Sequence, residues 1–137
     1  SMAHKTGAAY SGGHIVHGCA NAMYLPKVIK FNAKEPEAAK RYAEIARFID
    51  LKGSTEEELV DALIAELRGM NEKLNIPTCI KEYEGGIIDE TEFNEKLPSV
   101  AELAVGDACT GSNPRPITPA EMEKLLTCCY YDKEVDF

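Results

Sequence analysis

The sequence predicts an all-α protein, folded as an antiparallel helical bundle. No stretch of its 137 residues shows the sustained alternation of apolar and polar residues that is typical of a strand. Apolar residues recur instead at intervals of three and four, and several of these runs open on residues that cap the amino end of a helix. The loops between the runs are short, which favours antiparallel neighbours.

The first two helices are expected at 19–31 and 36–48. Between Cys19 and Phe31, helical intervals separate the apolar residues Ala20, Met23, Tyr24 and Val28. Pro26 lies inside this run and has no backbone N–H, so we expect a kink or a local break before it. Pro36 suits the first turn of the second helix. The buried side of that helix is expected to comprise Ala39, Tyr42, Ala43, Ile45 and Ala46.

A long third helix is expected from Ser54 to about Leu74. Ser54-x-x-Glu57 has the pattern of a capping box, in which the first and fourth residues satisfy each other's backbone N–H groups. The expected apolar stripe of this helix is Leu59, Leu63, Leu67 and Met70. A short turn after Pro77 then reaches Tyr83 and a glycine-rich break.

Three further helices are expected in the last third of the chain. Asp89-x-x-Glu92 opens one that ends near Leu97, and Ser99-x-x-Glu102 opens another that reaches about Ala108. Thr118-Pro119-x-Glu121 opens the last helix, which runs through Tyr130. Its inward face is expected to be Met122, Leu125, Leu126 and Cys129.

Composition limits the classes of partner. A formal net charge of −8, with charged residues well mixed along the chain, argues against nucleic acid and against anionic membrane surfaces. No apolar run has the length of a membrane span or a signal peptide. The five cysteines form no C-x-x-C pair, so free thiols in a reducing cytoplasm are expected, with Cys128 and Cys129 serving packing.

All three histidines, His4, His14 and His17, lie within the first seventeen residues. If one helical turn carries both His14 and His17, their rings share a face and can address a common ion or substrate. Two alternatives stay open at this point. The histidines can be ordinary surface or core residues, or His14, His17 and Cys19 can hold zinc, although a structural zinc site usually needs a fourth ligand.

Four segments in order along the chain carry a resemblance to a known family. They are Met2–Gly7 (MAHKTG), His14–Ala22 (HIVHGCANA), Leu74–Glu82 (LNIPTCIKE) and Asp107–Arg115 (DACTGSNPR). Together they resemble the iron-dependent (group III) alcohol dehydrogenases, including the alcohol dehydrogenase half of bifunctional aldehyde-alcohol dehydrogenases. In the last segment, we expect Asn113 to brace a turn and Arg115 to play a structural role, such as a bidentate pair with a carboxylate.

The resemblance implies a partial domain. It places residues 1–137 in the carboxy-terminal part of the family's helical metal-binding domain, which is of the dehydroquinate synthase-like type, with its first helices missing. The family's nucleotide-binding domain is expected to be absent, because the chain contains neither G-x-G-x-x-G nor a glycine-rich phosphate loop.

The resemblance also implies roles for the histidines. His17, immediately before Gly18, matches a ligand of the family's divalent metal, for which iron is expected rather than zinc. His4 matches a histidine assigned to substrate contact or proton transfer. The interval between them is about three residues longer than in the family, with Ser11-Gly12-Gly13 as the expected insertion, so His14 is expected either to line the substrate pocket or to face solvent.

The expected function is therefore that of a carboxy-terminal fragment of an alcohol dehydrogenase. The intact parent would interconvert small alcohols and aldehydes with NAD or NADP, whereas the 137 residues alone are expected to be inactive. The alternative is a non-catalytic helical fragment or subunit that self-associates or pairs with a separately encoded nucleotide-binding part. Amphipathic helices without partners would expose apolar surface, so a homo-oligomer is expected.

Overall fold

The computed structural model describes residues 1–137 and contains helices and no strands, which confirms the predicted all-α class. The α-helices are α1 (Met2–Thr6), α2 (His17–Asn32), α3 (Pro36–Phe48), α4 (Glu56–Lys73), α5 (Glu90–Val105) and α6 (Pro119–Tyr131). Two 3-10 helices, η1 (Ile80–Gly85) and η2 (Thr110–Ser112), join them. No helix is both long enough and apolar enough to cross a membrane.

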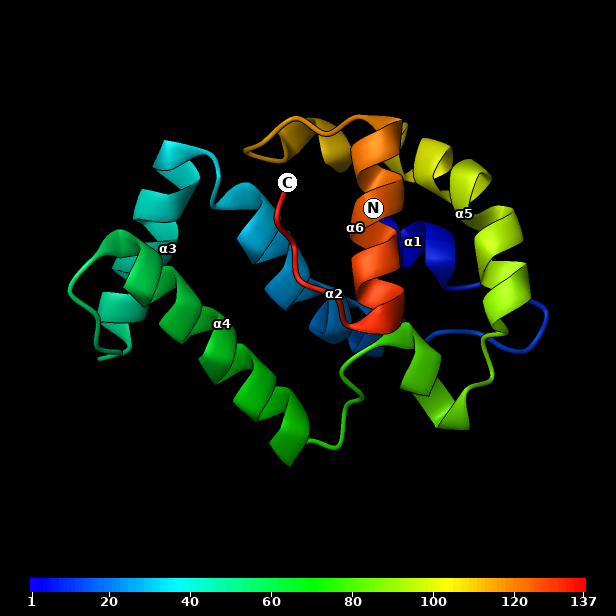
Figure 1. Cartoon of the computed structure of the whole chain (residues 1–137), viewed down its shortest axis with the longest axis horizontal. Helices are drawn as coiled ribbons and strands as arrows, with labels where there is room; N and C mark the ends of the chain where they lie inside the picture. Colours follow the sequence, from blue (N-terminus) through cyan, green and yellow to red (C-terminus); the bar gives the residue numbers. More distant parts are fainter.

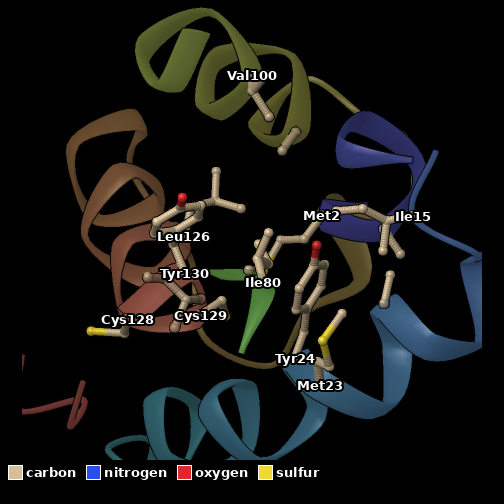
Figure 2. Close-up of a cluster of buried hydrophobic side chains, with 14 of the residues drawn as sticks. Met2, Ile15, Met23, Tyr24, Ile80, Val100, Leu126, Cys128, Cys129 and Tyr130 are labelled. Atoms are coloured by element: carbon tan, nitrogen blue, oxygen red, sulfur yellow. The ribbon is translucent and has the colours of Figure 1, made fainter. Parts of the chain in front are cut away.

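The helices form a body and an arm (Figure 1). The body consists of α1, α5, α6 and part of α2, while α3 and α4 pair as the arm on the other side of α2. A cluster of 22 buried residues fills the body, and a separate cluster of six fills the arm. Figure 2 shows the body's core, to which α6 contributes Leu126 and Tyr130, and α2 contributes Met23 and Tyr24.

Helices α3 and α6 begin where their local start signals predict them. The bounds of α3 coincide with the prediction, with Pro36 in its first turn. At the start of α6, Thr118 and Glu121 form the expected capping box, and all four predicted inward residues are buried. At α4 the predicted Ser54–Glu57 box is not formed. The N-cap is Thr55, whose hydroxyl accepts from the Glu58 N–H at 3.1 Å, and the Glu58 carboxylate accepts from the N–H of Ser54, the residue before the cap.

Of the kink or local break predicted before Pro26, the break does not occur, because α2 continues through this residue. A proline at this position leaves the carbonyl of Ala22 without its usual helical donor. The side-chain amide of Asn71, in α4, donates to that carbonyl at 2.8 Å. A donor from another helix therefore replaces the missing backbone N–H.

The predicted division of 89–108 into two helices is also wrong, because α5 is one helix with Pro98 inside it. Ser99 does not cap a helix, since its hydroxyl donates to the Lys96 carbonyl at 2.8 Å. Two residues predicted to face the core are exposed instead: Ile45 in α3 and Met70 in α4. The arm is only two helices thick, so it has no third layer to cover them.

The segment 107–117 crosses the end of the body and is hydrogen-bonded to the end of α2 and to the last residue of the chain. Asn113 donates to the Asn32 side chain at 2.8 Å and to the Arg115 carbonyl at 2.6 Å, as expected for a brace. The guanidinium of Arg115 donates to the backbone oxygens of Phe31 and Phe137 and lies 3.8 Å from the centre of the Phe31 ring. The nearest side-chain carboxylate oxygen, Oε1 of Glu121, lies 3.7 Å from Arg115 Nη2, so the expected bidentate pair with a carboxylate side chain is not formed.

Candidate functional site

The structure brings His4 and His17 together and leaves His14 apart. His4 lies in α1 and His17 is the first residue of α2; their rings stack with centroids 5.3 Å apart and an interplanar angle of 13°. The loop between the two helices is held by the Ile15 N–H, which donates to the Gly7 carbonyl at 2.9 Å, and by the Val16 N–H, which donates to the Tyr83 hydroxyl at 3.1 Å. These bonds fix where α2 begins, and hence where His17 stands.

His14 lies in that loop, before the helix starts, and its side chain is exposed. A shared helical face for His14 and His17 is therefore not formed. Nor do His14, His17 and Cys19 gather as the zinc alternative requires. The side chains that do gather in ligand-like fashion are His4, Asp107 and Cys109.

Asp107 is the centre of the polar contacts around His4. Its Oδ2 lies 3.3 Å from His4 Nδ1 and 3.1 Å from Lys5 Nζ. Its Oδ1 accepts from the Cys109 N–H at 3.0 Å and from the Ser1 hydroxyl at 3.3 Å. The bond from the Cys109 N–H, followed by the Lys5 ammonium, holds the pKa of this carboxyl well below its usual range.

This arrangement defines what His4 can do chemically. With a proton on Nδ1 directed at the Asp107 carboxylate, the other ring nitrogen stays available to accept or donate a proton. The sequence alone indicates no role for Asp107, although this residue begins the DACTGSNPR segment. The contact joins residues 103 positions apart, so no spacing pattern could have indicated it.

An apolar cavity of about 410 Å³ lies close to this group, between α1, α2, α6 and η2. Met2, Leu25, Val28 and Phe31 are among its apolar lining, and Ser1, Cys109 and Thr110 line it beside Asp107. No histidine lines it. The cavity could accept an aliphatic group, with polar contacts along one side only.

A family model described as "Fe-containing alcohol dehydrogenase family, C-terminal" matches residues 1–130. An NADPH-dependent butanol dehydrogenase from Clostridium saccharobutylicum is 56% identical over 137 residues, covering 100% of this chain and 33% of the relative. An aldehyde-alcohol dehydrogenase from Clostridium acetobutylicum is 39% identical over 142 residues, covering 93% of this chain and 16% of the relative.

Solved structures resemble the fold. The iron-containing alcohol dehydrogenase from Thermococcus thioreducens superposes with a TM-score of 0.76 at 31% identity, over 96% of this chain and 31% of that one. A 1,3-propanediol oxidoreductase gives a TM-score of 0.78 at 26% identity, over 94% of this chain and 31% of the other. The chain thus spans a third or less of the length of these relatives.

Proposed function

Because the chain belongs to the iron-containing alcohol dehydrogenase family, as part of its C-terminal region, we propose that it supplies helical residues to a metal-assisted enzyme that interconverts small alcohols and aldehydes with NAD or NADP. The observation that carries this proposal is the stacking of His4 on His17, 5.3 Å apart. These are the two histidines to which the resemblance gives a reactive role, and they come from separate motifs.

His17 fits a metal ligand by its chemistry. Its imidazole is exposed at the start of α2 and makes no hydrogen bond to another residue, so its nitrogens are free to bind. The remaining ligands would come from residues outside this chain, and iron is proposed over zinc. When bound, the metal would polarise the substrate oxygen and the nicotinamide would carry the hydride.

His4 would hold or move the proton of the substrate hydroxyl. Asp107 keeps the ring oriented through Nδ1 at 3.3 Å and, as a carboxylate, stabilises the protonated imidazole. Asp107 is thus a positioning residue in this proposal. A place for His14 in the substrate pocket stays a prediction.

The 137 residues alone are proposed to be inactive and to self-associate, in a cytoplasmic setting. The self-association rests on apolar side chains left in solvent at the end of α3: Phe48 is 88% exposed, and Ile45 and Ile49 are 48% and 46% exposed. The second candidate function, a non-catalytic helical subunit, draws on the same surface.

A chimaera tests the dehydrogenase proposal. Residues 1–137 would replace the matching third of the Clostridium saccharobutylicum butanol dehydrogenase, and NADPH-dependent turnover and bound metal would be measured. We expect turnover and stoichiometric metal, with both lost in His17→Ala. Lys40→Ala, on the exposed side of α3, serves as the control and should change neither.

The result that contradicts the proposal is a folded, metal-containing chimaera whose turnover and metal content survive His17→Ala. Assaying the 137 residues alone, and then mixed with the relative's amino-terminal two thirds, separates the two candidate functions. Recovery of turnover on mixing supports the dehydrogenase part. A stable complex without turnover supports the non-catalytic subunit.

A further inference from the structure

We propose that His4, Asp107 and Cys109 form a binding site for a thiophilic divalent cation of the zinc class, separate from the metal site to which His17 belongs. One ligand atom from each residue lies within 4.8 Å of those of the other two. An imidazole, a carboxylate and a thiolate are the three side-chain ligands that zinc uses most. The site would exist whether or not the chain takes part in a dehydrogenase.

The separations suit such an ion. With zinc–nitrogen and zinc–oxygen distances of about 2.0 Å and a zinc–sulfur distance of about 2.3 Å, tetrahedral ligands lie roughly 3.3 to 3.5 Å apart. His4 Nδ1 and Asp107 Oδ2 already lie 3.3 Å apart. Cys109 is exposed, so its side chain can rotate to bring the sulfur closer by the remaining ångström or so.

The backbone around the group is already in place. The loop after α5 is held by the Thr110 N–H, which donates to the Asp107 carbonyl at 2.9 Å, and by the Thr110 hydroxyl, which donates to the Ala104 carbonyl at 2.7 Å. The Cys109 N–H holds Asp107 Oδ1, which leaves Oδ2 facing α1. Two of the three ligands therefore come from one fixed turn, and binding needs little reorganisation.

The ammonium group of Lys5 competes with a metal ion for the Asp107 carboxylate. The Lys5 ammonium lies 3.1 Å from Asp107 Oδ2, the oxygen that would bind the ion. The Lys5 side chain is 32% exposed and long, so it can swing into solvent when a divalent ion enters. The carboxylate needs no deprotonation, because its pKa lies well below its usual range, and the thiol of Cys109 would release its proton on binding.

The site has one consequence for the proposed function. A cation bound to His4 Nδ1 would leave the ring's one proton on Nε2, so the imidazole could no longer accept a proton from the substrate hydroxyl. In an assembled dehydrogenase the site would therefore be inhibitory. Cation binding can be measured without turnover. A chain that binds no cation would therefore contradict this proposal without contradicting the dehydrogenase proposal.

Cobalt(II) is the probe, because a thiolate ligand gives it a near-ultraviolet charge-transfer band. The whole chain would be titrated without oxygen in the presence of a phosphine reductant, and zinc would then be added to displace the cobalt. We expect a band that saturates at one equivalent and disappears with Cys109→Ser. The band should persist in Cys19→Ser and in His17→Ala, with helicity checked by circular dichroism in every variant.

Cys19 is the matched control because it is also a free, partly exposed thiol and lies two residues from His17. Asp107→Asn should weaken cobalt binding by at least the roughly 10- to 100-fold that is lost when a residue behind the direct ligands is changed, because Asp107 is itself a ligand. Lys5→Met should strengthen binding, since it removes the competing ammonium. The proposal is overturned if wild type gives no band, if the band survives Cys109→Ser, or if His17→Ala or Cys19→Ser abolishes it.

Discussion

At the scale of single residues, Asp132 joins three parts of the chain. Its Oδ1 lies 2.8 Å from Lys27 Nζ, and Arg68 donates to its two oxygens at 3.0 and 2.8 Å. The Lys27 side chain is only 7% exposed, and it also donates to the Lys133 carbonyl at 2.7 Å. Asp132 therefore ties α2 and α4 to the end of α6, and its charge compensates a buried ammonium.

Replacing Asp132 with Asn should cost about 2 to 4 kcal/mol of unfolding free energy near neutral pH, because Lys27 would stay buried without its counter-charge. Urea unfolding measures this. Asp61→Asn is the control: it breaks a 2.7 Å pair with Lys30 whose two side chains are 54% and 34% exposed, and should cost less than about 1 kcal/mol. Equal losses in the two variants would contradict the role given to Asp132.

The same prediction has a pH dependence. Arg68 and then Lys27 lower the pKa of Asp132 from 3.8 to about 2 in the folded protein. A carboxyl with a lowered folded pKa contributes stability that is complete above its unfolded pKa and is lost as the pH falls through the folded value. The part that comes from ionisation, about 1 kcal/mol after solvent screening, should therefore fade between pH 4 and pH 2 in wild type and be absent from Asp132→Asn.

The candidate site shows what single residues reveal without a structure. The histidines could be singled out because they sit in motifs that resemble a family. Asp107 could not, because its contact with His4 depends on α1 meeting the loop after α5, and nothing local to either segment specifies that meeting. The position of His14 depends on where α2 begins. That start is held by the hydrogen bond from the Val16 N–H to the hydroxyl of Tyr83, a residue 67 positions away in the sequence.

At the scale of elements, Asn71 explains why α2 tolerates Pro26. We predict that Asn71→Ala destabilises the wild type by about 1 to 2 kcal/mol, because it leaves the Ala22 carbonyl without a donor. In a Pro26→Ala background the helix regains its own N–H, so the same substitution should cost less. Thermal or urea unfolding of the four proteins gives the coupling energy. A cost for Asn71→Ala that is equal in both backgrounds would show that the amide acts independently of the proline.

The starts of α3 and α6 were predictable from local signals, whereas the signal at Ser99-x-x-Glu102 was misleading, because Ser99 lies inside α5. Elements decided by distant contacts were not predictable. Pro36 and the Thr118 capping box set the starts of α3 and α6, where residue type alone fixes the first turn. The continuity of α2 depends on a side chain from α4, which is 45 residues beyond Pro26. The short helix α1 has no side-chain cap and forms where its residues Met2 and Ala3 are buried in the core.

At the scale of the whole molecule, the body and the arm have cores of unequal size. The body buries 22 residues in one cluster, including the Phe93 and Tyr130 rings stacked at 4.1 Å. The arm buries six, and of these only Ile29 comes from α2. The free energy needed to open a part of a protein is lower where fewer apolar contacts are buried. The arm should therefore unfold locally while the body stays folded.

Native-state hydrogen exchange tests this. Amides of α3 and α4 should exchange through an opening of lower free energy than those of α6. Leu63→Ala, in the arm's cluster, should lower the free energy of that opening by about 2 to 3 kcal/mol and leave the amides of α6 near wild type. Leu126→Ala is the matched change in the body's core, and it should lower protection in α6, because Leu126 is fully buried there. If Leu63→Ala lowered protection in α6 as much as in the arm, the two cores would be one cooperative unit. The ion pairs of Asp132 with Lys27 and Arg68 would then couple the unfolding of the two cores in spite of their different sizes.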